Sequence, residues 1–110
     1  MPYRAIHRYA RIAPRKARLV ADMIRGQRID AAMTALEFSK KRAAWYFKAI
    51  LKSAVANAEE HDADVHTLYI SETWVNQGPT IKRIRPKDRG RAHPIAKRTS
   101  HLQLALDERT

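Results

Sequence analysis

The sequence predicts an α+β fold in which three helices pack on a small three-stranded antiparallel sheet and a long β-hairpin protrudes from it. Three observations lead to this prediction. Strand-like alternation occurs near both ends of the 110-residue chain, and three segments with helical periodicity lie between these ends. A basic segment with too few apolar residues to build a core separates the last two strands. Helices grouped apart from the strands are typical of the α+β class.

The first strand and the first helix are expected within the first 26 residues. Residues 3–12, YRAIHRYARI, alternate imperfectly and are rich in aromatic and β-branched side chains, which favours a strand. A helix is expected over residues 14–26, because Pro14 suits a first helical turn and Gly26 can end a helix in the left-handed conformation. Its apolar stripe is predicted at Leu19, Val20, Met23 and Ile24. The opposite face would carry Arg15, Arg18, Asp22 and Arg25.

Two further helices are predicted between residues 31 and 60. Asp30 can cap a short helix over residues 31–38, and Ser39 can cap the longest helix, over residues 40–60. In the short helix the residues expected to face inward are Ala32, Met33 and Leu36. The long helix has one continuous apolar stripe, formed by Ala43, Phe47, Ile50, Leu51, Ala54 and Ala58. Another side of it carries a basic row with one aromatic residue: Lys41, Trp45, Lys48 and Lys52.

Two strands are predicted on either side of the basic segment. Residues 67–76 and 101–106 alternate as strands do. In the first, one face is expected to carry Leu68, Ile70 and Trp74, and the other Tyr69, Ser71, Thr73 and Val75. In the second, the inward residues are Leu102, Leu104 and Leu106. Because the two strands are adjacent along the chain, they most simply pair antiparallel.

The basic segment, residues 78–98, is then the far end of this hairpin and forms an arm. Pro86, Asp88 and Gly90 predict the turn. Each proline of the arm removes a ladder donor, so regular pairing is expected to fail in places. We therefore expect one domain over residues 1–110, with a globular part at residues 1–77 and 99–110.

The net charge of +11 is concentrated in two segments. Residues 1–28 contain eight Lys or Arg and one acid, as do residues 78–101, whereas residues 29–77 contain five bases and seven acids. Arg outnumbers Lys in both basic segments, and Arg binds phosphate in a fork geometry and stacks on bases. This favours a polyanionic partner over a surface that serves solubility alone.

Composition also indicates the cellular compartment in which the protein works. The chain has no Cys, so disulfides and thiolate chemistry are not available. No apolar run has the length of a signal peptide or a membrane span, so no membrane partner is expected. A cytosolic protein is predicted, and an organellar protein whose transit peptide has been removed stays open.

An enzyme is the main contrasting class. The chain has no Gly-rich phosphate loop and no nucleophile motif. His61 and His66 lie beside Asp62 and Asp64, but this polar loop lacks a regular ligand register, so we expect no metal site. A ribonuclease would need a paired acid and base, for which the candidates are Asp88 and His93. We therefore expect no catalytic residues and no cofactor.

A free-standing nucleic-acid-binding module is the closer alternative. The helix over residues 14–26 has the basic character of a helix that reads a groove. A helix-turn-helix needs a second helix shortly before it, and a strand is predicted there instead.

Four stretches carry a resemblance to a known family: IAPRKARLVADMIRG, KAILKSAVANAEEH, GPTIKRIRPKDRGRA and KRTSHLQLAL. They resemble the bacterial-type large-subunit ribosomal proteins of the L-twenty-two family. The resemblance covers nearly the whole chain, in the family's order, and SAVANAE is among its most specific motifs. The chain departs at Ala13, where the family often has a Ser that can cap the first helix. Without another cap, this loss destabilises the helix by about 1 kcal/mol.

The resemblance implies a structural constituent of the large ribosomal subunit, and not an enzyme. It implies binding to several domains of the large-subunit RNA and a part in early subunit assembly. The globular part would lie near the mouth of the nascent-peptide exit tunnel. The hairpin would line the tunnel, where it would meet the nascent peptide and ribosomal protein L-four. No homo-oligomer is expected.

The basic segments and the resemblance together predict the contact residues. The residues expected to bind RNA are Arg4, Arg8, Arg11, Arg15, Lys16, Arg18, Arg25, Lys82, Arg83, Arg85, Lys87, Arg89, Arg91, Lys97 and Arg98. The hairpin tip that would face the tunnel comprises Lys87, Asp88, Arg89, Gly90, Arg91 and Ala92.

Overall fold

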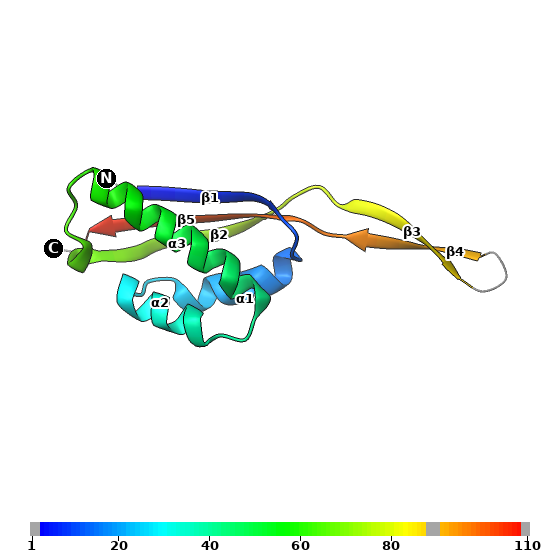
Figure 1. Cartoon of the computed structure of the whole chain (residues 1–110), viewed down its shortest axis with the longest axis horizontal. Helices are drawn as coiled ribbons and strands as arrows, with labels where there is room; N and C mark the ends of the chain where they lie inside the picture. Colours follow the sequence, from blue (N-terminus) through cyan, green and yellow to red (C-terminus); the bar gives the residue numbers. More distant parts are fainter. Residues whose placement is uncertain (1–2, 88–90, 109–110) are drawn as a thin grey trace.

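The computed structural model describes the backbone of residues 3–87 and 91–108 and the side chains of residues 3–80 and 97–108. Figure 1 shows the order of its elements along the chain. These are β1 (Tyr3–Ala10), α1 (Pro14–Ile24), α2 (Ile29–Phe38), α3 (Arg42–Glu60), one turn of 3-10 helix (Val65–Thr67), β2 (Leu68–Gln77), β3 (Ile81–Lys87), β4 (Arg91–Lys97) and β5 (Ser100–Glu108).

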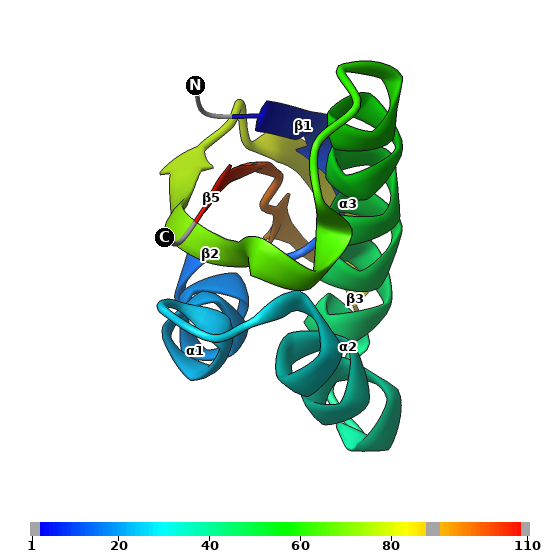
Figure 2. The same cartoon turned by 90° about the vertical axis from the view of Figure 1, so that its left-hand side faces the viewer.

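The prediction of three helices on a three-stranded antiparallel sheet is confirmed. The strand order is β1-β5-β2, and β5 pairs antiparallel with both of its neighbours. The predicted pairing of the two strands that flank the arm is therefore also confirmed. The end-on view in Figure 2 shows α3 running beside the sheet and α1 and α2 below β2.

The core lies between the sheet and the helices. Every residue of the predicted α3 stripe is buried, as are Leu102, Leu104 and Leu106 of β5. The ring of Phe47 is fully buried among them. The α3 stripe contains three alanines, and a side chain as small as that of Ala lets the sheet approach the helix closely.

The predicted stripe of α1 is wrong at one position. Leu19 is 55% exposed, and the buried face of the helix is formed by Pro14, Ala17, Val20, Ala21 and Ile24. These residues follow the spacing of a single helix face, and the small alanines allow close contact with β2. The helix ends at Ile24, before the predicted boundary. Gly26 does adopt the left-handed conformation (φ +82°), and its N–H donates to the Ile70 carbonyl at 2.9 Å.

Both predicted N-caps are wrong. α2 begins at Ile29, so Asp30 lies inside its first turn, where a negative charge is favourable beside the helix dipole. α3 begins at Arg42, and the Ser39 hydroxyl instead accepts a hydrogen bond from the Lys41 N–H at 3.3 Å. At Ala13, as expected, no side chain caps α1.

The predicted faces of β2 are wrong beyond Ile70, because the strand contains a β-bulge. Ile70 pairs with Leu106 and Glu72 pairs with Ala105, so one extra residue of β2 lies between these two pairs. An extra residue reverses the alternation beyond it. Thr73 and Val75 are therefore buried against the helices, and Trp74 lies on the other face.

The arm extends the long axis of the molecule, whose principal extents are 64 × 24 × 17 Å (Figure 1). β3 pairs antiparallel with β4 from Ile81↔Lys97 to Lys87↔Arg91. The described ladder runs through Pro86 and Pro94, and the break falls at residues 78–80, which contain Pro79. The predicted turn residues Asp88 and Gly90 lie outside the described residues.

Candidate nucleic-acid interface

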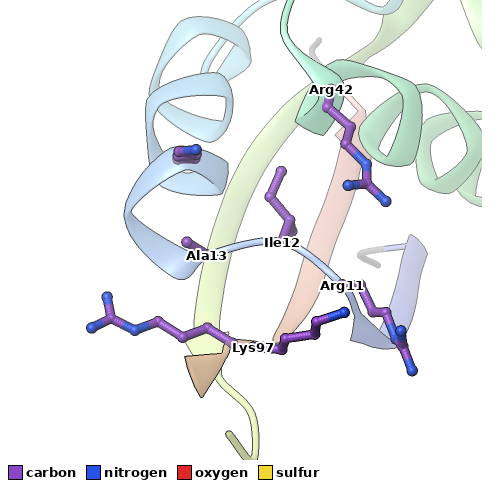
Figure 3. A pocket seen from close by; sticks show the side chains of 7 residues that line it. Arg11, Ile12, Ala13, Arg42 and Lys97 are labelled. Carbon is purple, nitrogen blue, oxygen red and sulfur yellow. The ribbon is translucent and has the colours of Figure 1, made fainter. Parts of the chain in front are cut away.

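A cationic pocket lies where the arm joins the sheet. It encloses about 700 Å³ and is lined by Arg11, Ile12, Ala13, Lys16, Arg42, Lys97 and Arg98. Five of these seven residues are cations, and none is acidic. In Figure 3 the side chains of Arg11, Arg42 and Lys97 are arranged around Ile12. Three segments far apart in the sequence thus meet at one positively charged surface.

Buried hydrogen bonds hold the floor of the cationic pocket in place. The Ser100 hydroxyl, which is fully buried, donates to the Ile12 carbonyl at 2.6 Å. The Ile12 N–H donates to the Ala10 carbonyl at 2.8 Å and so closes a tight turn after β1. Ile12 is buried by this arrangement, while its neighbour Arg11 is exposed. The link between β1 and α1 therefore presents a cation from a fixed backbone.

Two helices begin at this pocket and add to its positive potential. Arg42 is the first residue of α3, and Lys16 lies in the first turn of α1. Neither helix has a side-chain cap or an acidic residue in its first turn. The first N–H groups of a helix lack intrahelical partners and carry the positive end of its dipole. Together with the five cations, they suit the pocket to phosphate groups.

A smaller groove adjoins the cationic pocket. It encloses about 300 Å³ and is lined by Ile12, Lys16, Leu19, Lys41, Arg42 and Ala43. The exposed Leu19 therefore contributes an apolar wall beside cations instead of packing into the core. A surface that combines apolar and cationic side chains can contact both sugars and phosphates.

Charge is divided along the long axis of the molecule. Six of the eleven acids lie at the C-terminal ends of α3 and β5 or just after α3: Glu59, Glu60, Asp62, Asp64, Asp107 and Glu108. Figure 1 shows both ends on the side of the sheet opposite the arm. There, the Tyr3 hydroxyl donates to Glu108 at 3.1 Å. The pKa of Tyr3 is raised, first by desolvation and then by the negative charges of Glu108 and Asp107.

Comparison with known proteins gives the family. Residues 5–107 match the family described as ribosomal protein L22p/L17e. This chain belongs to that family. The resemblance seen in the sequence is therefore confirmed. The chain is a ribosomal protein, which has a structural role and is not an enzyme, and its place is the ribosome in the cytoplasm.

Three curated relatives are each named large ribosomal subunit protein uL22. The relative from Clostridium novyi (strain NT) is 49% identical over 110 residues, which cover 99% of both chains. The relative from Magnetococcus marinus is 53% identical over 104 residues, or 94% of this chain and 92% of the relative. The relative from Rubrobacter xylanophilus is 56% identical over 104 residues, or 94% of this chain and 82% of the relative.

In this ribosomal protein, four of the predicted contact residues meet in the cationic pocket: Arg11, Lys16, Lys97 and Arg98. Arg4 and Arg8 lie instead on the sheet face that carries Trp74, where Arg4 and Trp74 line a pocket of about 170 Å³. Arg15 is exposed on α1.

Two predicted contact residues have structural partners. The Arg25 guanidinium bonds to the Asp22 carboxylate at 2.7 Å and to the Thr73 carbonyl at 2.8 Å. Arg18 donates to the Val75 carbonyl at 3.3 Å. Both side chains fasten α1 to β2, although both residues stay exposed. The element before α1 is the strand β1, as predicted, so α1 is not the second helix of a helix-turn-helix.

The remaining predicted contacts lie on the arm. The backbones of Lys82, Arg83, Arg85, Lys87 and Arg91 belong to the paired strands β3 and β4. Their side chains lie outside the described set, as does Arg89. Of the predicted tip, Asp88, Arg89 and Gly90 lie outside the described residues, and Lys87, Arg91 and Ala92 are strand residues.

Arg42 lines the cationic pocket but is not among the predicted contact residues. The signal was the run of three bases at residues 40–42 immediately before a predicted helix. The net charge of residues 29–77 hides this run, because the segment as a whole contains more acids than bases.

The polar loop after α3 is explained by local structure. The Asp64 carboxylate accepts the His66 N–H at 3.0 Å and caps the 3-10 turn, and His61 Nδ1 lies 2.9 Å from the Asn57 carbonyl oxygen. Among the described residues, no group of three His, Cys, Asp or Glu side chains is placed to hold a metal ion. No helix in the described part of the chain is long and apolar enough to cross a membrane.

Proposed function

We propose that this chain, a structural constituent of the large ribosomal subunit, binds the subunit's RNA through the cationic pocket and the basic arm that leaves it. The observation that carries the proposal is the pocket itself. Five cations and no acidic residue line this pocket of about 700 Å³, which lies beside the first turns of two helices without side-chain caps. Like charges gathered in this way repel one another, and phosphates relieve the repulsion.

The physical role of this surface is to fix position. Contacts to phosphates set the orientation and register of a bound protein but carry no sequence information. Arg11, Arg42 and Arg98 can each engage a phosphate through two parallel hydrogen bonds, which fixes an angle as well as a distance. The pocket would therefore determine the direction in which the arm enters the RNA.

The arm would carry the second part of the function. Both of its strands contain Lys and Arg residues, so an arm among RNA segments would neutralise phosphates along its length. We propose that it contacts several domains of the RNA, supports early assembly and lines the nascent-peptide exit tunnel close to ribosomal protein L-four. The sequence resemblance and the long extent of 64 Å support this placement.

Salt dependence tests the RNA proposal. A transcript of large-subunit RNA is titrated with wild-type protein and with the triple variant K16Q/R42Q/K97Q at several salt concentrations. The matched control, K40Q/K48Q/K52Q, removes the same charge from residues outside the pocket. We expect the logarithmic salt slope to decrease by roughly 0.9 for each phosphate contact that the pocket variant loses. The control should keep a slope close to that of the wild type.

Two results would contradict the RNA proposal. An affinity of the wild type that hardly changes with salt would exclude a phosphate interface. Equal losses of slope in the two triple variants would show that net charge matters and that the pocket does not.

The tunnel proposal has its own test. Ribosomes with short deletions within residues 81–92 should still assemble but should respond differently to macrolides and to stalling peptides, because the sequence resemblance implies a tip in the tunnel wall. If the responses in both assays are unchanged, the proposed tunnel role is wrong. The RNA proposal does not depend on this result.

A further inference from the structure

Tyr9 occupies an unusual place at the end of β1. His7 pairs with Leu102 and Ala10 pairs with Ser100, so Arg8 and Tyr9 together oppose the single residue His101. This is a β-bulge, and Tyr9 has the left-handed backbone conformation (φ 58°) within it. Residues with a Cβ avoid this conformation, and a bulky side chain there marks strain.

The bulge decides which side chain enters the core. Tyr3, Ala5 and His7 alternate toward the helices, so regular alternation would place Tyr9 on the same inner face. Instead Ala10 is buried, with 1% of its surface exposed, and the Tyr9 side chain is 61% exposed. The fold therefore turns a large aromatic ring out of the core and into solvent.

Little in the described structure compensates for this exposure. The Tyr9 N–H donates to His101 Nδ1 at 3.2 Å, which any residue at this position could do. The ring itself makes one T-shaped contact with His101, with centroids 4.9 Å apart. A glycine would suit the backbone better, so the strain and the exposed ring call for another reason.

The surroundings of the ring indicate its partner. Arg8 and Arg11 flank Tyr9 along the chain and are exposed, and Arg11 lines the cationic pocket. An exposed aromatic ring between cations is the combination that binds unpaired nucleotides, because the ring stacks on a base while the cations hold the phosphates.

We infer that Tyr9 is a stacking platform for an unpaired base of the large-subunit RNA, next to the phosphates bound in the cationic pocket. The inference rests on the proposed function, since it names one residue of the same interface. The bulge re-aims the side chain outward, and the hydrogen bond to His101 holds the bulge. Any base can stack on this ring, so the contact adds affinity at a fixed point without selecting a sequence.

Four variants test the platform. Affinity for the transcript of large-subunit RNA is measured for Y9F, Y9L, Y9G and F38L at several salt concentrations. F38L is the matched control, because Phe38 at the end of α2 is also highly exposed, at 82%. We expect Y9L and Y9G to lose roughly 5- to 150-fold in affinity, and Y9F and F38L to remain close to the wild type. The salt slope should not change, because stacking releases no counterions.

Thermal unfolding separates binding from stability. Y9G relieves the strained conformation and Y9L retains it, so Y9G should melt at a higher temperature than Y9L although both bind RNA weakly. If Y9L and Y9G bind with wild-type affinity, the inference about Tyr9 is wrong. The proposed function would still hold in that case, provided that the affinity of the wild type depends steeply on salt. A loss in F38L equal to that in Y9L would overturn it too. If the affinity of the wild type does not change with salt concentration, both proposals are wrong.

Discussion

Phe47 and Trp45 stand two positions apart on α3 and have opposite environments. Phe47 is 0% exposed, whereas Trp45 is 68% exposed and makes a T-shaped contact with Tyr46, with centroids 5.0 Å apart. Helix geometry separates these two positions by about 200° around the axis, so one points into the core and the other toward solvent. The same substitution therefore has different consequences at each.

We expect F47A to lower the free energy of unfolding by about 3–5 kcal/mol, because it removes a fully buried ring and leaves a cavity. W45A should change stability far less, since it removes little buried area. Urea unfolding followed by circular dichroism measures both. Similar losses in the two variants would show that the α3 stripe is not the centre of the core.

At the scale of elements, the junction between the sheet and the arm depends on close packing. The Gly78 N–H donates to the Thr99 carbonyl at 2.9 Å, and the Thr99 hydroxyl donates to the Pro79 carbonyl at 2.6 Å. A Cβ on Gly78 would lie 2.6 Å from the Thr99 Oγ1. These two bonds tie the first residues of the arm to the residue that precedes β5.

G78A should therefore destabilise the protein by roughly 1–3 kcal/mol, because the buried Thr99 side chain must move and leave its hydrogen bond. T99A makes room for the new Cβ, so the double variant should be more stable than the sum of the single effects predicts. Chemical unfolding of the four proteins completes the cycle. Strict additivity would mean that this contact does not explain why Gly is required.

Elements with regular periodicity could be predicted, and those set by pairing could not. The α3 stripe and the β5 leucines repeat with the period of their element, so their burial follows from the sequence. Trp74 could not be placed, because a bulge in β2 reverses the alternation, and bulges depend on the register with β5. Tyr9 is displaced by the same kind of irregularity in β1.

The candidate site was predictable only in part. Its Arg and Lys residues follow from the charge distribution, and four of them meet in the cationic pocket. Arg42 joins them only because α3 begins beside the turn after β1, a contact between segments about 30 residues apart that charge counts cannot reveal. Arg18 and Arg25 also donate to backbone carbonyls of β2, and charge counts cannot reveal these bonds either.

At the level of the whole molecule, the core residues that the structure describes all belong to the globular part, residues 1–77 and 99–110. We propose that residues 1–77 and 99–110 fold without the arm. Deleting residues 82–95 should leave the helical circular dichroism signal and the cooperative melt in place, while affinity for large-subunit RNA decreases. Loss of all cooperative structure in the deletion variant would contradict this division.

Binding of RNA by the basic end of the molecule is tested by comparing residue reactivity in the free protein and in purified large subunits. Lysines are labelled with an amine-reactive reagent and carboxylates with a carbodiimide, and mass spectrometry reads each site. We predict that Lys16 and Lys97 lose reactivity in the subunit, whereas Glu59 and Glu60 at the opposite end keep theirs. Lys16 and Lys97 that react equally in both states would contradict the account.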